Sequence, residues 1–275
     1  MIFDLHSHST CSDGLLSPFD LVERAVQRGV DVLALTDHDE IKGVAAAREA
    51  ADHWGIRLVN GVEISVLWDD VTLHIVGLNI DTGYQPLADG LAAIRSGREM
   101  RAQRMAESLA AVGIGGALEG ARRYAKNPEL VSRSHFARYL VEVGHARDTN
   151  AVFRHFLTPG KPGYVPHKWA ALADALQWIH GSGGIAVLAH PGRYELGDAK
   201  RERLLGEFVE RGGAAVEVVT GSHAPTEFVT WARHARNFGL LASAGSDFHG
   251  PGEGYRDIGN VPALPSGCDP VWARF

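Results

Sequence analysis

Short apolar runs that each end in a histidine or a carboxylate most constrain how this chain can fold. The run at residues 30–35 leads into Asp37-His38, and the run at 57–62 leads into Glu63. Patterns with helical spacing separate these runs, and such alternation is typical of an α/β fold with a parallel sheet and right-handed crossovers. Because parallel strands end at the same edge, we expect the polar side chains that follow them to converge there.

The alternation fits about seven strands and is interrupted once, in the middle of the chain. Residues 84–169 hold only helical patterns, at 88–112, 116–125, 134–143 and 150–157, before a loop rich in Pro and Gly. We therefore predict a distorted (β/α)7 barrel from residues 1–84 and 170–275, with residues 85–169 as a helical insertion that caps the substrate side. An open, doubly wound sheet is the alternative, although no glycine-rich phosphate loop marks the chain as a dinucleotide binder.

Length and composition fit one large core without a membrane segment. The chain has 275 residues, 45% of them hydrophobic, and neither a long apolar run nor a basic and apolar leader. Its two cysteines, Cys11 and Cys268, offer neither a disulfide framework nor a thiolate zinc site. We expect a cytoplasmic protein with no membrane partner, and the oligomeric state stays open.

Charge is distributed unevenly along the chain. The formal net charge is −6, yet residues 95–168 contain thirteen Lys and Arg against six acidic residues. A basic segment beside an acidic body suggests an anionic substrate held between them, although solvated helix faces are the alternative explanation.

Nine residues of ligand type carry the functional prediction. Any one of them could be a structural side chain, but eight fall at or just past the end of a predicted strand, where the loops of a β/α barrel form one cavity. They are His6, His8, Asp13, His38, Glu63, His190, Asp247 and His249, with His74 within a strand. Imidazole and carboxylate ligands without thiolate suit Mn²⁺, Zn²⁺ or Fe²⁺. Nine ligands exceed one coordination sphere, so we expect two or three ions, with Glu63 as a bridging ligand.

Besides His74, which stands alone, these residues lie in six motifs: His6-Ser7-His8, Ser12-Asp13-Gly14, Leu35-Thr36-Asp37-His38-Asp39, Gly61-Val62-Glu63, Ala189-His190-Pro191-Gly192 and Gly245-Ser246-Asp247-Phe248-His249. In combination they resemble the PHP (polymerase and histidinol phosphatase) family of metal-dependent phosphoesterases, within the amidohydrolase-like barrels. The resemblance implies a distorted (β/α)7 barrel with a centre of two or three metals, Mn²⁺ first among them. It implies one metal held by His6, His8, Glu63 and Asp247, a second by Glu63, His74 and His190, and a third by Asp13, His38 and His249.

The insertion carries a more local resemblance. Its segments at 132–137 and 161–166 are similar to those of stand-alone PHP proteins that include 5′→3′ exoribonucleases and nucleoside 3′,5′-bisphosphate phosphatases. This implies a phosphatase that removes the 3′-phosphate from a nucleoside 3′,5′-bisphosphate, such as adenosine 3′,5′-bisphosphate (pAp), through metal-activated hydroxide, leaving AMP. A 5′→3′ exonuclease on short RNA or DNA oligonucleotides is the alternative, and a non-catalytic metal- or nucleotide-binding module is a third hypothesis.

The same hypothesis assigns roles to further residues. Asp247 and His249 are candidates for stabilising the leaving oxygen, and His223, at another strand end, is a second candidate proton donor. A second, non-reacting phosphate needs fixed donors. The predicted donors are Arg133, Ser134, His135, Lys161 and Arg193. Three aromatic residues are predicted to stack on a base or to pack in the core: Phe136, Tyr164 and Trp169.

Overall fold

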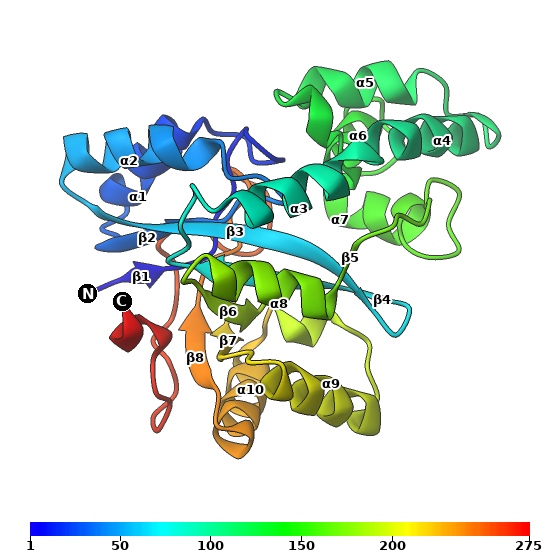
Figure 1. Cartoon of the computed structure of the whole chain (residues 1–275). Coiled ribbons are helices and arrows are strands. Elements are labelled where there is room, and N and C mark those ends of the chain that lie inside the picture. The colour runs from blue at the N-terminus through cyan, green and yellow to red at the C-terminus, as the bar shows by residue number, and fades with distance from the viewer.

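Seven strands form a curved sheet that wraps into a barrel, with helices on its outside (Figure 1). The computed structural model describes all residues, 1–275. The strands follow the order β1-β2-β3-β4-β6-β7-β8, and the two-residue β5 pairs with β3. Their bounds are β1 Phe3–Asp4, β2 Val32–Leu35, β3 Arg57–Trp68, β4 Val71–Leu78, β5 Ala170–Ala171, β6 Ile185–Leu188, β7 Ala215–Val219 and β8 Leu241–Ala244.

The sheet is nearly closed, because the chain after β1 runs beside the chain after β8. The N–H of Leu5 donates to the carbonyl oxygen of Ala244 at 3.0 Å, and the N–H of Asp247 donates to that of His6 at 2.9 Å. The prediction of a distorted seven-stranded α/β barrel is confirmed. The closure also brings the first and last ligand motifs of the chain side by side.

One strand departs from the expected parallel pattern. β4 pairs antiparallel with both β3 and β6, whereas the other neighbouring strands pair in parallel. β3 and β4 form a hairpin whose turn residues, Asp69 and Asp70, have φ angles of 47° and 62°, a region that Asp enters more readily than most residues. The expectation of a parallel sheet is therefore wrong at β4, because residues 63–68 extend β3 into a hairpin.

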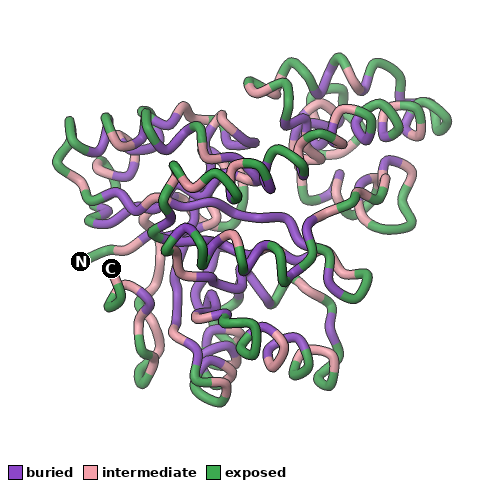
Figure 2. Tube along the Cα trace, viewed as in Figure 1, coloured by how far each residue is buried: buried purple, intermediate pink, exposed green.

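Six helices cover the barrel: α1 Pro18–Gln27, α2 Gly43–Trp54, α3 Gln85–Ser96, α8 Leu172–Gly181, α9 Asp198–Glu210 and α10 Pro225–Phe238. Local sequence sets their ends. Ser17 caps α1 by accepting a hydrogen bond from the N–H of Asp20 at 3.1 Å, and α2 ends at Gly55 with a φ of 72°. The buried residues line the strands and the inner faces of the helices (Figure 2). None of the helices combines the length and the apolar character that a bilayer span requires.

The helices α4 to α7 form a group at one side of the barrel, apart from the other helices (Figure 1). They are α4 Arg98–Ala110, α5 Ala117–Tyr124, α6 Arg133–Glu142 and α7 Thr149–Val152, which continues into a π-helical turn, Phe153–Leu157. A core of their own, which includes Met105, Leu109 and Phe136, holds them together. The insertion therefore has the buried apolar surface that an independent packing unit needs.

The helix α3 packs with the barrel instead of with this group. Its residues Leu87, Leu91 and Ile94 belong to the same apolar core as β3, β4 and α8. The long helix predicted at 88–112 is two helices, α3 and α4, separated at Gly97. The predicted division at residue 85 stays a prediction, and the packing favours a boundary near Gly97 instead.

Candidate active site

The predicted ligand motifs meet at the end of the barrel that faces the helical insertion. Backbone hydrogen bonds align the loops there: the N–H of His8 donates to Phe248 O, and the N–H of Asp39 donates to Glu63 O, both at 2.9 Å. Gly14 lies so close to the His8 backbone that a Cβ atom would come within 2.3 Å of the His8 carbonyl oxygen. Only glycine therefore lets the loop after β1 fold back and present Asp13.

Glu63 lies at the centre of the cluster. It is fully buried, and its carboxylate contacts imidazoles that lie within β4 or just after β1, β2 and β6. Nitrogen atoms of five histidines lie 2.8–3.4 Å from its two oxygens, from His6, His8, His38, His74 and His190. A carboxylate so surrounded has the geometry of a ligand shared between ions.

Three overlapping groups of side chains could each hold a cation. Within each group the candidate ligand atoms lie within 4.8 Å of one another. The groups are His6, His8, Glu63 and Asp247; His8, Asp13, His38 and His249; and His38, Glu63 and His74. The first group equals the set that the family resemblance implies, the second adds His8, and the third has His38 in place of His190. His190 is nonetheless close, with its Nε2 atom 2.8 Å from Glu63 Oε1 and 3.3 Å from His74 Nδ1.

The polar atoms of this cluster need partners that the protein itself does not supply. Buried atoms that make no hydrogen bond include His6 Nε2, both ring nitrogens of His8, Asp13 Oδ1, His38 Nδ1, Glu63 Oε2 and His190 Nδ1. Orphaned buried polar atoms are costly, and in natural proteins they point to a ligand or a function. The donor set fits divalent cations, since it consists only of imidazole and carboxylate.

The surroundings of Glu63 and His8 set the protonation states of these two residues. Burial alone would raise the pKa of Glu63, but the imidazoles of His38, His74 and His6 outweigh it and hold that pKa well below its ordinary value. Burial, together with His249 and His38, lowers the pKa of His8 to about 3. At neutral pH the carboxylate is therefore charged and the His8 imidazole is neutral, which are the forms that bind metals.

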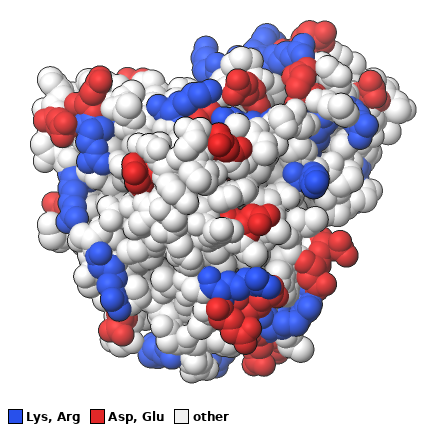
Figure 3. Space-filling view, in the orientation of Figure 1, with Lys and Arg blue, Asp and Glu red and all other residues white.

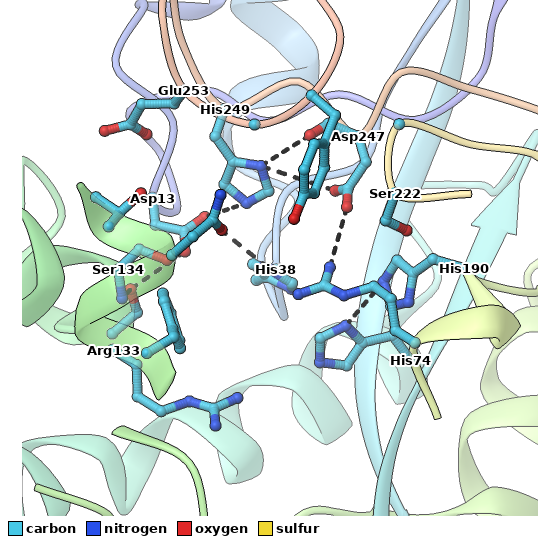
Figure 4. Close-up of a pocket in the computed structure, with 18 of the residues that line it drawn as sticks. Asp13, His38, His74, Arg133, Ser134, His190, Ser222, Asp247, His249 and Glu253 are labelled. Carbon is cyan, nitrogen blue, oxygen red and sulfur yellow. Dashed lines mark hydrogen bonds and ion pairs between the residues drawn. The ribbon is translucent and has the colours of Figure 1, made fainter. Parts of the chain in front are cut away.

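A cavity of about 470 Å³ opens above the cluster (Figure 4). Its floor is formed by six of the predicted ligands, Asp13, His38, His74, His190, Asp247 and His249. The insertion contributes the opposite wall, including Arg98, Arg101, Arg133 and Ser134. Barrel and insertion thus enclose one space, with potential metal ligands on one side and cationic groups on the other.

In the basic wall Arg98 and Arg101 are buried and Arg133 is half-buried, and two of these arginines lack a carboxylate partner. Arg98 forms an ion pair with Asp39, but Arg101 donates only to the carbonyl oxygen of Val165, at 2.8 Å, and Arg133 only to that of Leu157, at 3.4 Å. Burial, with the neighbouring Arg133 and Arg98, lowers the pKa of Arg101 to about 9. Guanidinium groups crowded together without counter-charge need an anion from solution.

The predicted phosphate donors divide into two sets. Arg133 and Ser134, at the start of α6, line the cavity, and so does Arg193, whose Nη1 lies 3.1 Å from Asp247 Oδ2. Lys161 is exposed and does not line the cavity, and His135 is buried, with its Nδ1 accepting a hydrogen bond from the N–H of Ser132 at 3.0 Å. The structure therefore does not support direct phosphate contacts by Lys161 or His135.

His223 does not reach the cavity either. Its Nε2 accepts a hydrogen bond from the N–H of Gly192 at 2.9 Å, and its Nδ1 lies 3.1 Å from the carbonyl oxygen of Val218. Both ring nitrogens are thus engaged with backbone groups, and the ring stacks on Trp231. This geometry does not support His223 as a proton donor and gives it a part in holding the His190-Pro191-Gly192 turn.

The aromatic side chains of the cavity were mostly missed from the sequence. Phe136 is fully buried in the core of the insertion, and Tyr164 does not line the cavity. Trp169 does, but the guanidinium groups of Arg98 and Arg101 lie 4.9 and 5.4 Å from its ring centre. Phe153 and Tyr255 line the cavity instead. Phe153 begins the π-helical turn after α7 and Tyr255 lies in the loop after β8, and neither belongs to a ligand motif that would have marked it.

Comparisons with known proteins agree with this geometry of the candidate active site. Residues 4–218 match the PHP domain family. The chain belongs to the PHP family. It is 53% identical over 272 residues to a 3′,5′-nucleoside bisphosphate phosphatase of Chromobacterium violaceum, covering 99% of this chain and 95% of the relative. It is 46% identical over 274 residues to the 5′-3′ exoribonuclease Rnm of Escherichia coli, covering 99% and 93%.

Solved structures share the fold of this chain. An amidohydrolase from Chromobacterium violaceum, with bound sulfate and no metal, superposes with a TM-score of 0.97 at 51% identity, covering 100% of this chain and 95% of the other. A protein from Bifidobacterium adolescentis, named as a candidate metal-dependent phosphoesterase, reaches 0.81 at 25% identity, covering 99% and 93%. The predicted membership in the PHP family is confirmed, and the chain is a phosphoesterase of this family with a site for divalent metals.

Proposed function

We propose that this PHP protein hydrolyses the 3′-phosphate of nucleoside 3′,5′-bisphosphates, with pAp as the leading substrate and AMP and phosphate as products. The observation that carries the proposal is one cavity of about 470 Å³ that joins a metal-ligand cluster to a wall in which Arg101 and Arg133 have no carboxylate partner. Such a cavity accommodates two phosphate groups of one small molecule, one on each side. The whole-chain likeness to a relative named for this activity supports the same conclusion.

We propose that the nine clustered His, Asp and Glu residues hold two or three ions, with Mn²⁺ as the first candidate and Zn²⁺ or Fe²⁺ as alternatives. Divalent ions in such a centre polarise phosphoryl oxygens and lower the pKa of bound water. The side chains of the protein set where these ions would bind. Glu63 connects the groups on either side of it, and Asp13 and Asp247 add negative charge at the cavity floor.

Different residues of the chain bind the two phosphates of the substrate. Arg101, Arg133 and the N-terminus of α6 at Ser134 are positioned to hold the non-reacting 5′-phosphate. Arg193, beside Asp247, is positioned to contact the phosphate that reacts. A water oxygen bonds to phosphorus as the P–O bond to the 3′-oxygen breaks, and His249 at the cavity is our candidate to protonate that oxygen. Asp247 is not a proton donor in this proposal, because the neighbouring imidazoles outweigh its burial and hold its pKa well below the ordinary value.

The likeness to the exoribonuclease Rnm favours a second candidate function. In a 5′-phosphorylated oligonucleotide, the first phosphodiester occupies the place of the 3′-phosphate of a bisphosphate, so the same two subsites would serve a 5′→3′ exonuclease. In Figure 3 the basic and acidic side chains of one face are interspersed and form no continuous basic track. This face therefore offers no track for long nucleic acid, and the formal net charge of −6 also favours short oligonucleotides.

The test compares three nucleotides with the Mn²⁺-loaded protein: a nucleoside 3′,5′-bisphosphate, the 3′-monophosphate and the 5′-monophosphate. We expect phosphate release to be fastest from the bisphosphate, with the 5′-monophosphate as product. Short oligonucleotides with and without a 5′-phosphate, assayed alongside, measure the exonuclease. A protein that releases neither phosphate nor mononucleotides would refute both candidates, and faster release from the 3′-monophosphate would refute the two-phosphate site.

A further inference from the structure

Glu217 is a buried carboxylate beside the metal-ligand cluster that belongs to none of the three candidate groups. It stands in the middle of β7, where the other residues are Ala215, Val216, Val218 and Val219. It is 1% exposed, and both of its oxygens are engaged. A charged side chain in a fully buried strand is costly unless its partners use it.

One oxygen of Glu217 fixes the ring of His6. Glu217 Oε1 lies 2.7 Å from His6 Nδ1. With Nδ1–H donating to this carboxylate, the lone pair of Nε2 faces Glu63 Oε2 at 3.2 Å and Asp247 Oδ1 at 3.5 Å. Histidine ligands of metals depend on such a hydrogen bond, because it selects the tautomer and the ring orientation.

The other oxygen of Glu217 holds the backbone of His190. The N–H of His190 donates to Glu217 Oε2 at 2.6 Å. His190 has a φ of 28°, a left-handed conformation that a residue with a Cβ atom adopts only when its surroundings hold it there. From this position His190 Nε2 reaches Glu63 Oε1 at 2.8 Å. One carboxylate therefore anchors two candidate ligands that lie against different oxygens of Glu63.

We infer that Glu217 is a positioning residue for the metal centre: it sets the tautomer of His6 and the backbone turn at His190, so that both imidazoles meet at Glu63. It acts through these two residues and contacts neither substrate nor the cavity. The inference rests on the metal centre of the proposed function and assigns a role to a residue outside the ligand motifs.

The substitution Glu217→Gln tests the role, because glutamine keeps the size and replaces one acceptor oxygen with an amide donor. The amide nitrogen then either opposes the N–H of His190 or donates to His6 Nδ1, which moves the His6 proton to Nε2. Either arrangement weakens the site, and loss of such a partner typically lowers metal affinity about 10–100-fold. Zn²⁺ binding measured against a competing chelator, with bound ions counted by elemental analysis, should show that loss.

The matched control is Glu207→Gln, which removes a carboxylate that accepts a hydrogen bond from Trp68 Nε1 at 2.8 Å, outside the cavity. This variant should bind Zn²⁺ with the affinity and stoichiometry of the wild type. Melting curves in chelator compare the folds of the two variants. Wild-type affinity in Glu217→Gln would overturn the inference.

A second measurement needs no substitution and decides the matter even where Glu217→Gln fails to fold. Nitrogen-15 spectra of the histidine rings in the Zn²⁺-loaded wild-type protein should show the His6 proton on Nδ1. A proton on Nε2, or a metal bound through Nδ1, would overturn the inference. Both experiments use the metal alone, so their results are independent of whether bisphosphates are the substrate.

Discussion

Arg101 holds a guanidinium group inside the protein without a carboxylate beside it. It is 6% exposed, and its nearest charged neighbours include two further arginines of the cavity wall, Arg98 and Arg133. A fixed cationic group in this setting contributes binding energy only when an anion arrives. The residue is therefore a direct probe of the second phosphate of the substrate.

The substitution Arg101→Met should raise KM for a nucleoside 3′,5′-bisphosphate by about 10–100-fold, since a hydrogen bond to a charged group contributes about 1.5–3 kcal/mol. The value of kcat should change less, because the contact is to the phosphate that does not react. Steady-state kinetics with the 3′-monophosphate, which lacks that phosphate, should show little change. Arg104→Met, on the exposed face of the same helix, is the control. Equal losses with both substrates would contradict the assignment.

Three cavity residues could be predicted from the sequence: Arg133, Ser134 and Arg193. Each lies at a predicted helix start or just after a ligand motif, so its place in the fold follows from that element. The sequence could not identify Arg101, since a basic residue in a helix faces either solvent or a cavity according to how the helix docks. Glu217 was missed for a related reason. One acid in an apolar strand shows its role only when the facing strands place His6 and His190 against it.

Among the elements, helix α6 joins the insertion to the cavity through its first turn. Ser132 caps the helix, and its Oγ donates to Asp13 Oδ2 at 3.2 Å. His135, three residues on, accepts from the N–H of Ser132 and completes a capping box. The helix start that we propose for phosphate binding is thus tied to a predicted metal ligand.

Burial lowers the pKa of His135 to about 4, with Arg138 adding to the effect against the attraction of Asp13. The unfolded chain, with a histidine pKa near 6.5, binds the proton more readily, so stability falls as pH drops from about 6.5 towards 4. The loss due to this group is up to about 3 kcal/mol. His135→Gln keeps the capping box and removes the titration. Urea unfolding in chelator at pH 7 and pH 4.5 should show a smaller loss in the variant, and an equal loss would refute the role of His135.

Two helical glycines should respond in opposite ways to the same substitution. A Cβ atom on Gly120 of α5 would lie 2.1 Å from the ring of Tyr139 in α6, whereas one on Gly206 of α9 meets nothing within 4 Å. Gly120→Ala should therefore destabilise the insertion by about 1–3 kcal/mol. Gly206→Ala should stabilise the protein by about 0.5–1 kcal/mol through helix propensity. Denaturant unfolding measures both, and a Gly120→Ala variant as stable as the wild type would contradict the packing of α5 on α6.

The elements themselves were largely predictable, because each depends on local signals. The strands ending near His38 and His190 are short, continuous apolar runs, and the helix α1 begins at Ser17-Pro18 as its cap predicts. The antiparallel β4 was not predicted. Strand direction is set by whether the connection is a hairpin or a crossover, and the two-residue turn at Asp69 and Asp70 gives only a weak signal of a hairpin.

At the scale of the whole molecule, Arg138 links three parts of the chain that enclose the cavity. From α6 it forms a two-pronged ion pair with Glu253 in the loop after β8, at 2.6 and 2.7 Å, and donates to the carbonyl oxygen of Asp13 at 2.6 Å. The insertion is therefore fastened to both ends of the barrel sheet at the site where the ligands gather. Closure of the barrel, docking of the insertion and assembly of the cluster are parts of one folded arrangement.

This arrangement makes the stability of the protein depend on metal. Folding gathers three carboxylates and six histidines, and six of these nine residues hold buried polar atoms without a hydrogen bond, whereas the unfolded chain leaves those atoms in water. A cation that binds only the folded state stabilises it by about 2.7 kcal/mol per site at a concentration 100 times its dissociation constant.

For a chain of this size, each such site should raise the melting temperature by about 5–10 °C. Calorimetry in Mn²⁺ and in chelator measures the shift, and Glu63→Gln should abolish most of it because Glu63 belongs to two of the three groups. Equal melting temperatures with and without Mn²⁺ in the wild type would show that the cluster forms without the ions and does not bind them.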